Sequence, residues 1–96
     1  MMHKSTKAIH GGNPHRSHFG EVSVPIFQTS TFSFPCAEEG AARFSGESSG
    51  YVYSRLGNPT VNALEENVTA LEGGCRGMAT ATGMAAVTTV FLSLRA

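Results

Sequence analysis

Residues 58–74, NPTVNALEENVTALEGG, contain the clearest structural signal in the sequence. Asn58 and Pro59 predict the start of a helix, because an Asn side chain accepts hydrogen bonds from first-turn amides and Pro suits the first helical position. Gly73 and Gly74 supply the positive backbone angle that commonly ends a helix. Between them, apolar residues recur at spacings of three, four and three, as on one helix face. This apolar face comprises Val61, Leu64, Val68 and Leu71, and the solvent face comprises Glu65, Glu66 and Asn67.

A short uncharged segment and a second apolar period follow this helix. Residues 77–81, GMATA, predict a buried strand, and residues 82–84 predict a turn into another helix. The order helix, strand, helix is how α/β proteins with a buried parallel sheet begin. We expect an α/β domain that is incomplete within these residues, because one strand makes no sheet and an uncharged helix needs cover on all sides. The apolar residues of the second helix are Met84, Val87, Phe91 and Leu94.

The residues before this region predict an arm rather than a packed domain. Residues 1–35 contain three of the four prolines and all four histidines, and they show no helical apolar period. Proline interrupts or ends the β-branched and aromatic runs, and it lacks the donor that a central strand needs. We expect an extended arm, then a short helix at 37–44 and a flexible loop at 45–50. The predicted division is an arm at 1–57 and the start of a packed domain at 58–96.

Composition and charge exclude several kinds of partner. The 96 residues carry seven Lys plus Arg and seven Glu, so no basic stripe suggests nucleic-acid binding. The uncharged stretch between Arg76 and Arg95 contains Gly, Thr and Ser, which favours a buried core over a membrane span. No apolar signal-peptide segment follows the N-terminal charges, so we expect a cytoplasmic protein.

The cysteines and histidines do not predict a metal site. Cys36 and Cys75 are far apart in the sequence and belong to no paired motif. The histidines at positions 10, 15 and 18 lie among Gly and Pro, with no cysteine or acidic partner at ligand spacing. We therefore expect two reduced thiols and no bound metal.

Two short segments could bind an anion. The turn Thr82-Gly83-Met84 places free amides and the positive end of a helix dipole at one point, and Thr82 adds a hydroxyl. Tyr53 and Arg55 flank one residue in a segment predicted to be extended, so they should project to the same side. A guanidinium fork beside a phenol suits a phosphate or carboxylate. From these residues alone, a structural turn and a surface Arg packed along a Tyr ring are the commoner explanations.

Three motifs in this order resemble those of the Cys/Met metabolism (trans-sulfuration) enzymes that use pyridoxal phosphate. They are YVYSRLGNPT at 51–60, LEGG at 71–74 and ATGM at 81–84, and the arm is similar at 9–12 and 24–32. The resemblance covers about residues 7–95. It implies the N-terminal arm and the beginning of the large domain of a type I, aspartate aminotransferase-like fold.

The resemblance also implies a cofactor, pyridoxal 5'-phosphate, and roles for five residues. Thr82, Gly83 and Met84 would bind the cofactor phosphate, whereas Tyr53 and Arg55 would reach the phosphate of a cofactor held by a neighbouring subunit. Residues 1–57 would then be an inter-subunit segment of a homodimer or homotetramer with shared active sites. The substrates of the family are sulfur amino acids or homoserine esters.

The residues of these motifs are closest to those of lyases of the methionine γ-lyase or cystathionine γ-lyase type, which break a carbon–sulfur bond by elimination. The alternatives in the family are a cystathionine γ-synthase and an O-acetylhomoserine sulfhydrylase. The family's Schiff-base lysine and ring-nitrogen aspartate have no counterpart here, since the sequence has no Asp and its only lysines are Lys4 and Lys7. We therefore expect no catalytic residue in this chain, which would be an inactive fragment. A non-catalytic phosphate-binding or docking module is the alternative of another class.

Overall fold

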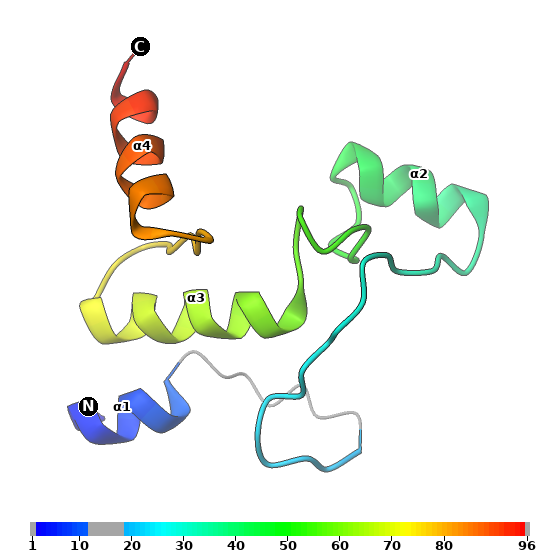
Figure 1. The fold of residues 1–96 in the computed structure, drawn as a ribbon. Coiled ribbons are helices and arrows are strands. Elements are labelled where there is room, and N and C mark those ends of the chain that lie inside the picture. Colours follow the sequence, from blue (N-terminus) through cyan, green and yellow to red (C-terminus); the bar gives the residue numbers. More distant parts are fainter. Residues whose placement is uncertain (1, 12–18, 96) are drawn as a thin grey trace. The chain divides into compact units, whose positions relative to one another are not determined.

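The computed structural model describes residues 2–11 and 19–95 (Figure 1). Within these ranges the only pairing between extended segments is one antiparallel bridge, which joins Thr31 to Tyr53. The chain divides into two units, one of Met1–Gly12 with Leu64–Ala96 and the other of Asn13–Ala63. The helices of the described ranges are α1 (Lys4–His10), α2 (Ala37–Ser45), α3 (Pro59–Glu72) and α4 (Gly83–Leu94).

Helix α3 begins and ends where the sequence predicts. The side-chain oxygen Oδ1 of Asn58 accepts a hydrogen bond from the N–H of Thr60 at 2.9 Å, which caps the helix. At the other end Gly73 takes a φ of 66°, in the left-handed region, and the N–H of Gly74 donates to the carbonyl oxygen of Thr69 at 3.0 Å. Both predicted ends are confirmed.

The strand predicted at residues 77–81 is not formed within the described ranges. A strand requires a neighbour that shares its backbone hydrogen bonds, and no other described segment pairs with this one. The N–H of Ala79 instead donates to the carboxylate of Glu65 on α3 at 2.8 Å. The assignment of Glu65 to the solvent face of its helix was therefore wrong, because this carboxylate holds the segment that leads into α4.

The N-terminal residues differ from the extended arm that the sequence predicts. Residues 4–10 form α1, whose seven residues are too few to show an apolar period. The N–H of Gly11 donates to the carbonyl oxygen of Lys7 at 2.8 Å, and the side-chain amide of Asn67 on α3 donates to that of Ala8 at 3.2 Å. From residue 19 to residue 36 the chain is irregular and extended apart from its single bridge, as predicted. His15 and His18 lie outside the described residues.

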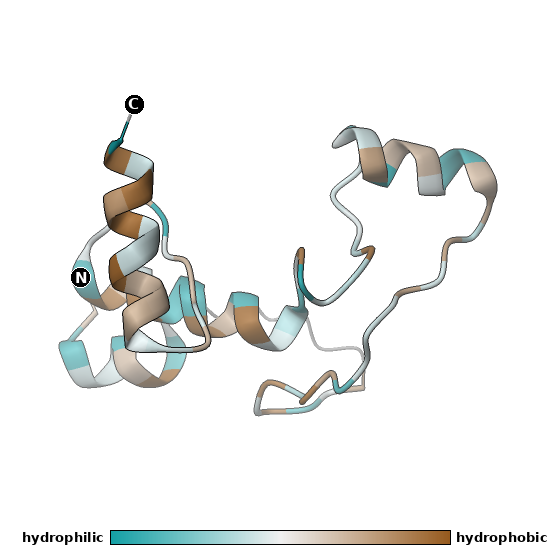
Figure 2. Cartoon of the chain, turned by 45° about the horizontal axis from the view of Figure 1, so that its top comes forward, coloured by the Kyte–Doolittle hydropathy of each residue, from teal (hydrophilic) through white to brown (hydrophobic). Residues whose placement is uncertain are grey.

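No apolar side chain is buried in the described ranges, and most of the large ones are exposed. Figure 2 shows hydrophobic residues on successive turns of α4. Phe91 and Leu94 on this helix are 70% and 77% exposed, so the buried core predicted for this stretch is not formed by the described residues themselves. None of the helices in the described ranges has the length and apolarity needed to cross a membrane.

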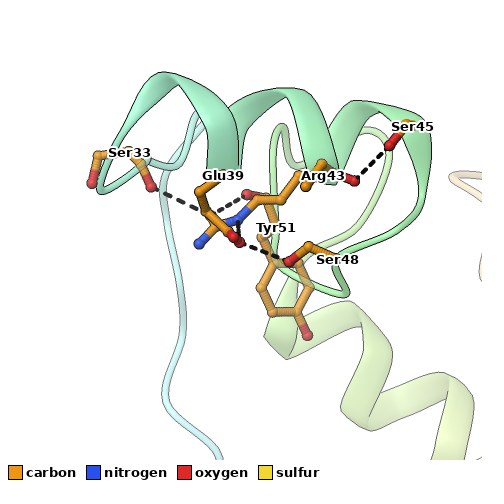
Figure 3. Close-up of polar contacts among 7 residues, drawn as sticks. Ser33, Glu39, Arg43, Ser45, Ser48 and Tyr51 are labelled. Carbon is orange, nitrogen blue, oxygen red and sulfur yellow. Dashed lines mark hydrogen bonds and ion pairs between the residues drawn. The ribbon is translucent and has the colours of Figure 1, made fainter.

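A group of polar contacts around Arg43, the α2 clamp, fixes the segments on either side of α2 (Figure 3). Arg43 donates from Nε to the carboxylate of Glu39 at 2.9 Å, and from a terminal nitrogen to the carbonyl oxygens of Tyr51 at 2.9 Å and Ser33 at 3.3 Å. The hydroxyl of Ser48 donates to the same Glu39 oxygen at 2.7 Å. The predicted short helix is confirmed, and the loop after it is tied back to it.

We expect the α2 clamp to depend on pH. Hydrogen bonds from Ser48 and Arg43 hold the pKa of Glu39 below its ordinary value. A lowered folded-state pKa contributes stability above the ordinary Glu pKa of about 4.3, and this contribution is lost as the pH falls through the folded value. In the full-length protein, Glu39→Gln should lower the melting temperature near neutral pH by a few degrees at most, since the pair is partly exposed.

The difference in melting temperature between wild type and Glu39→Gln should shrink as the pH is lowered from about 6 to about 3. The exposed Glu38 on the same helix provides the matched control, Glu38→Gln. A difference that stays constant over this range would contradict the prediction.

Candidate functional site

The first turn of α4 has two backbone amides that are free to bind an anion. Thr82 caps this helix, because its hydroxyl oxygen accepts from the N–H of Ala85 at 3.0 Å and its carbonyl oxygen accepts from Ala86 at 3.2 Å. The N–H groups of Gly83 and Met84 precede these donors and have no acceptor among the described residues. Free amides at the positive end of a helix dipole attract negative charge.

The space beside this turn is open. A Cβ atom built on Gly83 meets nothing within 4 Å, so a ligand could approach the backbone there. The hydroxyl of Thr82 accepts a hydrogen bond but donates none within the described residues, so its proton is also available. The Met84 side chain is exposed. Two amides and one hydroxyl of this turn are therefore available as donors to an anion.

The segment before this turn lies very close to α3. A Cβ built on Gly77 would come within 2.7 Å of the Thr69 hydroxyl oxygen and 3.0 Å of the Glu65 carbonyl oxygen. These two atoms are joined to each other by a hydrogen bond of 2.6 Å, so neither moves away freely. Glycine is therefore required at position 77 for the close approach that positions the α4 turn.

We expect Gly77→Ala to destabilise the full-length protein by about 1–3 kcal/mol, the usual cost of inserting a methyl group into a filled space. Its melting temperature should fall accordingly. Gly74→Ala is the matched control, because the nearest atom to a built Cβ at Gly74 is a Thr69 methyl carbon at 3.8 Å, an ordinary contact. Equal melting temperatures for the two variants would show that position 77 tolerates a side chain.

Tyr53 and Arg55 lie together, although not for the predicted reason. Arg55 is in a turn rather than an extended segment, because the N–H groups of Leu56 and Gly57 both donate to the Tyr53 carbonyl oxygen, at 2.9 and 3.1 Å. The guanidinium carbon of Arg55 lies 4.9 Å from the centroid of the Tyr53 ring, a cation–π contact. The turn, not the alternation of a strand, brings the two side chains together.

The Arg55 guanidinium is free to bind an anion from another molecule. Its side chain is exposed, and it makes no hydrogen bond or ion pair within the described residues. The fork can therefore offer parallel donors to a phosphate or carboxylate, as sequence analysis predicts from the residue types. Stacking on Tyr53 restricts the guanidinium without occupying its donors.

The structure adds residues that the sequence pattern does not associate with either segment. The carboxylate of Glu65 holds the segment before the α4 turn. No local pattern predicts that it accepts a hydrogen bond, because the donor, Ala79, lies 14 residues later. Ser54 and Thr60 contact the arm near the Tyr53–Arg55 turn. The signal for these two was present, since small polar residues flank the capping Asn58 within one motif.

Comparison with known proteins gives consistent results. The family described as Cys/Met metabolism PLP-dependent enzyme matches residues 5–96. The L-methionine γ-lyase of Pseudomonas putida is 48% identical over 90 residues, which cover 94% of this chain and 23% of that protein. The O-acetyl-L-homoserine sulfhydrylase of Corynebacterium glutamicum is 43% identical over 89 residues, or 93% of this chain and 20% of that protein. The chain thus spans about a fifth of the length of these curated relatives.

A solved structure from Campylobacter jejuni is similar in fold. It superposes with a TM-score of 0.87 at 36% identity, and the match covers 96% of this chain and 22% of that one. That chain contains N'-pyridoxyl-lysine-5'-monophosphate at position 205. The helices described above therefore match part of a much longer chain that carries a pyridoxyl group.

Proposed function

Because this chain belongs to the Cys/Met metabolism PLP-dependent enzyme family, we propose that it is the N-terminal segment of a lyase that eliminates at the carbon–sulfur bond of a sulfur amino acid, of the methionine γ-lyase type. The observation that carries the proposal is the open turn at 82–84, with two free amides, in a chain 48% identical to an L-methionine γ-lyase. The alternatives in the family, a cystathionine γ-synthase or an O-acetylhomoserine sulfhydrylase, are kept because a sulfhydrylase is 43% identical.

The cofactor of the family is pyridoxal phosphate, and the residues at the α4 turn fit its phosphate group. The amides of Gly83 and Met84 and the hydroxyl of Thr82 would donate to phosphate oxygens. The helix dipole favours the phosphate charge, and the open space at Gly83 allows it to reach the backbone. This part of the chain would therefore bind and orient the cofactor.

We propose that Tyr53 and Arg55 bind the phosphate of a cofactor held by a neighbouring subunit. An exposed guanidinium with unused donors supports this role, because it is available to a second molecule. The protein would be a homodimer or homotetramer with shared active sites. Residues 1–57 would be its arm and inter-subunit segment, and residues 58–96 the start of its cofactor-binding domain.

The chemical step would require residues from beyond this segment. When bound, pyridoxal phosphate supplies an electron sink for carbanions that form at the amino acid. The cofactor needs a lysine that carries it. The lysines of this sequence, Lys4 and Lys7, are both on α1, and Lys4 is exposed. The sequence has no Asp to hold the cofactor's ring nitrogen. These residues would therefore position the phosphate but not catalyse elimination.

The substrate assignment is tested with the full-length protein and added pyridoxal phosphate. We expect L-methionine to yield a 2-oxo acid, ammonia and a thiol. Formation of a sulfur amino acid from an acylated homoserine and sulfide, without 2-oxo acid from methionine, would instead support the sulfhydrylase. The 96-residue chain alone should give no 2-oxo acid above a variant with both lysines replaced by arginine, and turnover above that control would contradict its expected inactivity.

A melting experiment on the isolated chain separates the fragment from a non-catalytic module. We expect no sharp cooperative transition and strong self-association, because large apolar residues of α4 are exposed and none in the described ranges is buried. Calorimetry with analytical ultracentrifugation measures both properties. A sharp cooperative melt of a monomer would favour the independent phosphate-binding or docking module.

A further inference from the structure

Asn58 makes more hydrogen bonds than a helix cap needs. Its side chain is the one buried polar side chain in the described residues, at 6% exposure. The oxygen Oδ1 caps α3, a task that Ser or Asp performs equally well. The nitrogen Nδ2 makes two further bonds, to the carbonyl oxygen of Phe27 at 2.9 Å and to the hydroxyl oxygen of Ser54 at 3.0 Å. Only an amide side chain can accept at the helix and donate twice to other segments.

Ser54 and Thr60 extend these contacts along the arm. The hydroxyl of Ser54 donates to the carbonyl oxygen of Thr29, and its N–H donates to that of Ser30 at 2.8 Å. The hydroxyl of Thr60 donates to the carbonyl oxygen of Pro25 at 2.8 Å and accepts from the N–H of Phe27 at 2.9 Å. We call Ser54, Asn58 and Thr60 the polar triad. It fixes arm residues 25–30 to the turn and to the start of α3.

The polar triad holds the turn that carries Arg55 at both of its ends. Ser54 precedes Arg55 and is anchored through both its hydroxyl and its N–H, while Asn58 closes the turn and is buried. The Arg55 guanidinium has no hydrogen bond of its own in the described residues, so the backbone and the Tyr53 ring determine where it points. Fixing a binding group in advance reduces the entropy lost when it binds.

The polar triad also leaves the charge of Arg55 uncompensated. Its three side chains are neutral, and the partners described above are backbone groups or one another. The ion pair found in the described residues joins Glu39 to Arg43 and does not involve Arg55. These uncharged side chains therefore order the guanidinium without competing with an anion for it. A carboxylate at the same place would compete.

We propose that Ser54, Asn58 and Thr60 are positioning residues for the anion-binding pair Tyr53–Arg55, with Asn58 the central one. This inference rests on the proposed function, because it assumes that the pair binds the cofactor phosphate. Asn58 acts through Arg55 and touches no ligand itself. Its contribution is therefore confined to ligands that carry the phosphate.

The variant Asn58→Ser isolates this role, because Ser keeps the helix cap and adds no charge but lacks the amide nitrogen that makes the two further bonds. In the full-length protein it should weaken binding of pyridoxal phosphate by roughly threefold to tenfold and leave binding of pyridoxal, which has no phosphate, unchanged. Thr60→Val should act in the same direction, and Thr60→Ser should restore binding because it keeps the hydroxyl. The matched control is Asn67→Ser, the same change on α3 at a residue whose amide contacts Ala8.

Combination with Arg55→Ala completes the test. If Asn58 acts through Arg55, then Asn58→Ser causes no further loss of pyridoxal phosphate binding in the Arg55→Ala background. Equal weakening of pyridoxal and pyridoxal phosphate, or a full loss in that background, would overturn the inference and leave Asn58 with a purely structural role. If Arg55→Ala weakens binding and Asn58→Ser does not, the inference alone fails. If Arg55→Ala leaves phosphate binding unchanged, the proposed role of Arg55 fails, and the inference with it.

Discussion

Arg55→Ala should weaken binding of pyridoxal phosphate to the full-length protein by about tenfold to a hundredfold, the usual effect of removing hydrogen bonds to a charged group. The guanidinium fork is exposed and free of intrachain hydrogen bonds, so its donors are available to a phosphate. Arg55→Lys should also impair binding, because an ammonium group cannot reproduce two parallel bonds. The dissociation constant is measured by adding the cofactor back to the apoprotein.

The matched control is Arg76→Ala, which removes another exposed arginine of the described chain. This variant should bind the cofactor as the wild type does. Pyridoxal without its phosphate should bind equally to wild type and Arg55→Ala. An unchanged dissociation constant for pyridoxal phosphate in Arg55→Ala would contradict the phosphate-binding role and leave a surface arginine stacked on Tyr53.

The parts of the fold that the sequence predicts correctly depend on local interactions. Asn58 and Pro59 specify the start of α3, and Gly73 ends it through its own backbone angle. The predicted turn into a helix at 82–84 is equally local, since the donor to the Thr82 hydroxyl at the start of α4 is three residues away. Each signal and its partner lie within one helical turn, so a single sequence contains both.

The errors arise where the structure depends on distant partners. The strand predicted at 77–81 needs a neighbouring strand, and the described residues contain none for it. The sequence pattern places Glu65 on the solvent face because its backbone donor, Ala79, is not on the same helix. The second role of Asn58 depends on the carbonyl oxygen of Phe27, 31 residues earlier. No spacing within a single helix or turn reveals such pairs.

The candidate site shows the same contrast. The residue types at Tyr53, Arg55 and Gly83 predict anion binding because their chemistry is intrinsic. Their arrangement was only partly predictable, since Tyr53 and Arg55 meet through a turn. The Tyr53–Arg55 pair and the α4 turn of one chain need not act at the same site, because each is proposed to act with the other group from a neighbouring subunit. This separation makes the proposed sharing of sites testable with two defective variants.

Gly83→Asp should disable the α4 turn while preserving the helix. A Cβ at this position meets no atom within 4 Å, and the helix dipole stabilises a carboxylate in the first turn. The new charge would occupy the anion position and repel the cofactor phosphate, so binding should weaken by roughly a hundredfold or more. Gly83→Ala controls for the added carbon and should cause a smaller loss. Wild-type affinity in Gly83→Asp would contradict a phosphate at this turn.

Mixing Arg55→Ala and Gly83→Asp subunits should then restore activity, although each variant alone binds the cofactor poorly. A mixed dimer contains one site with the intact α4 turn of the Arg55→Ala subunit and the intact Arg55 of its partner. Random assortment of equal amounts makes about half of the dimers mixed, each with one intact site of two, so about a quarter of the wild-type sites return. Activity and bound cofactor are measured after the variants are unfolded together and refolded. Wild-type subunits refolded in parallel are the control. If they refold fully and the mixture shows no recovery, Tyr53 and Arg55 act within their own subunit or not at all.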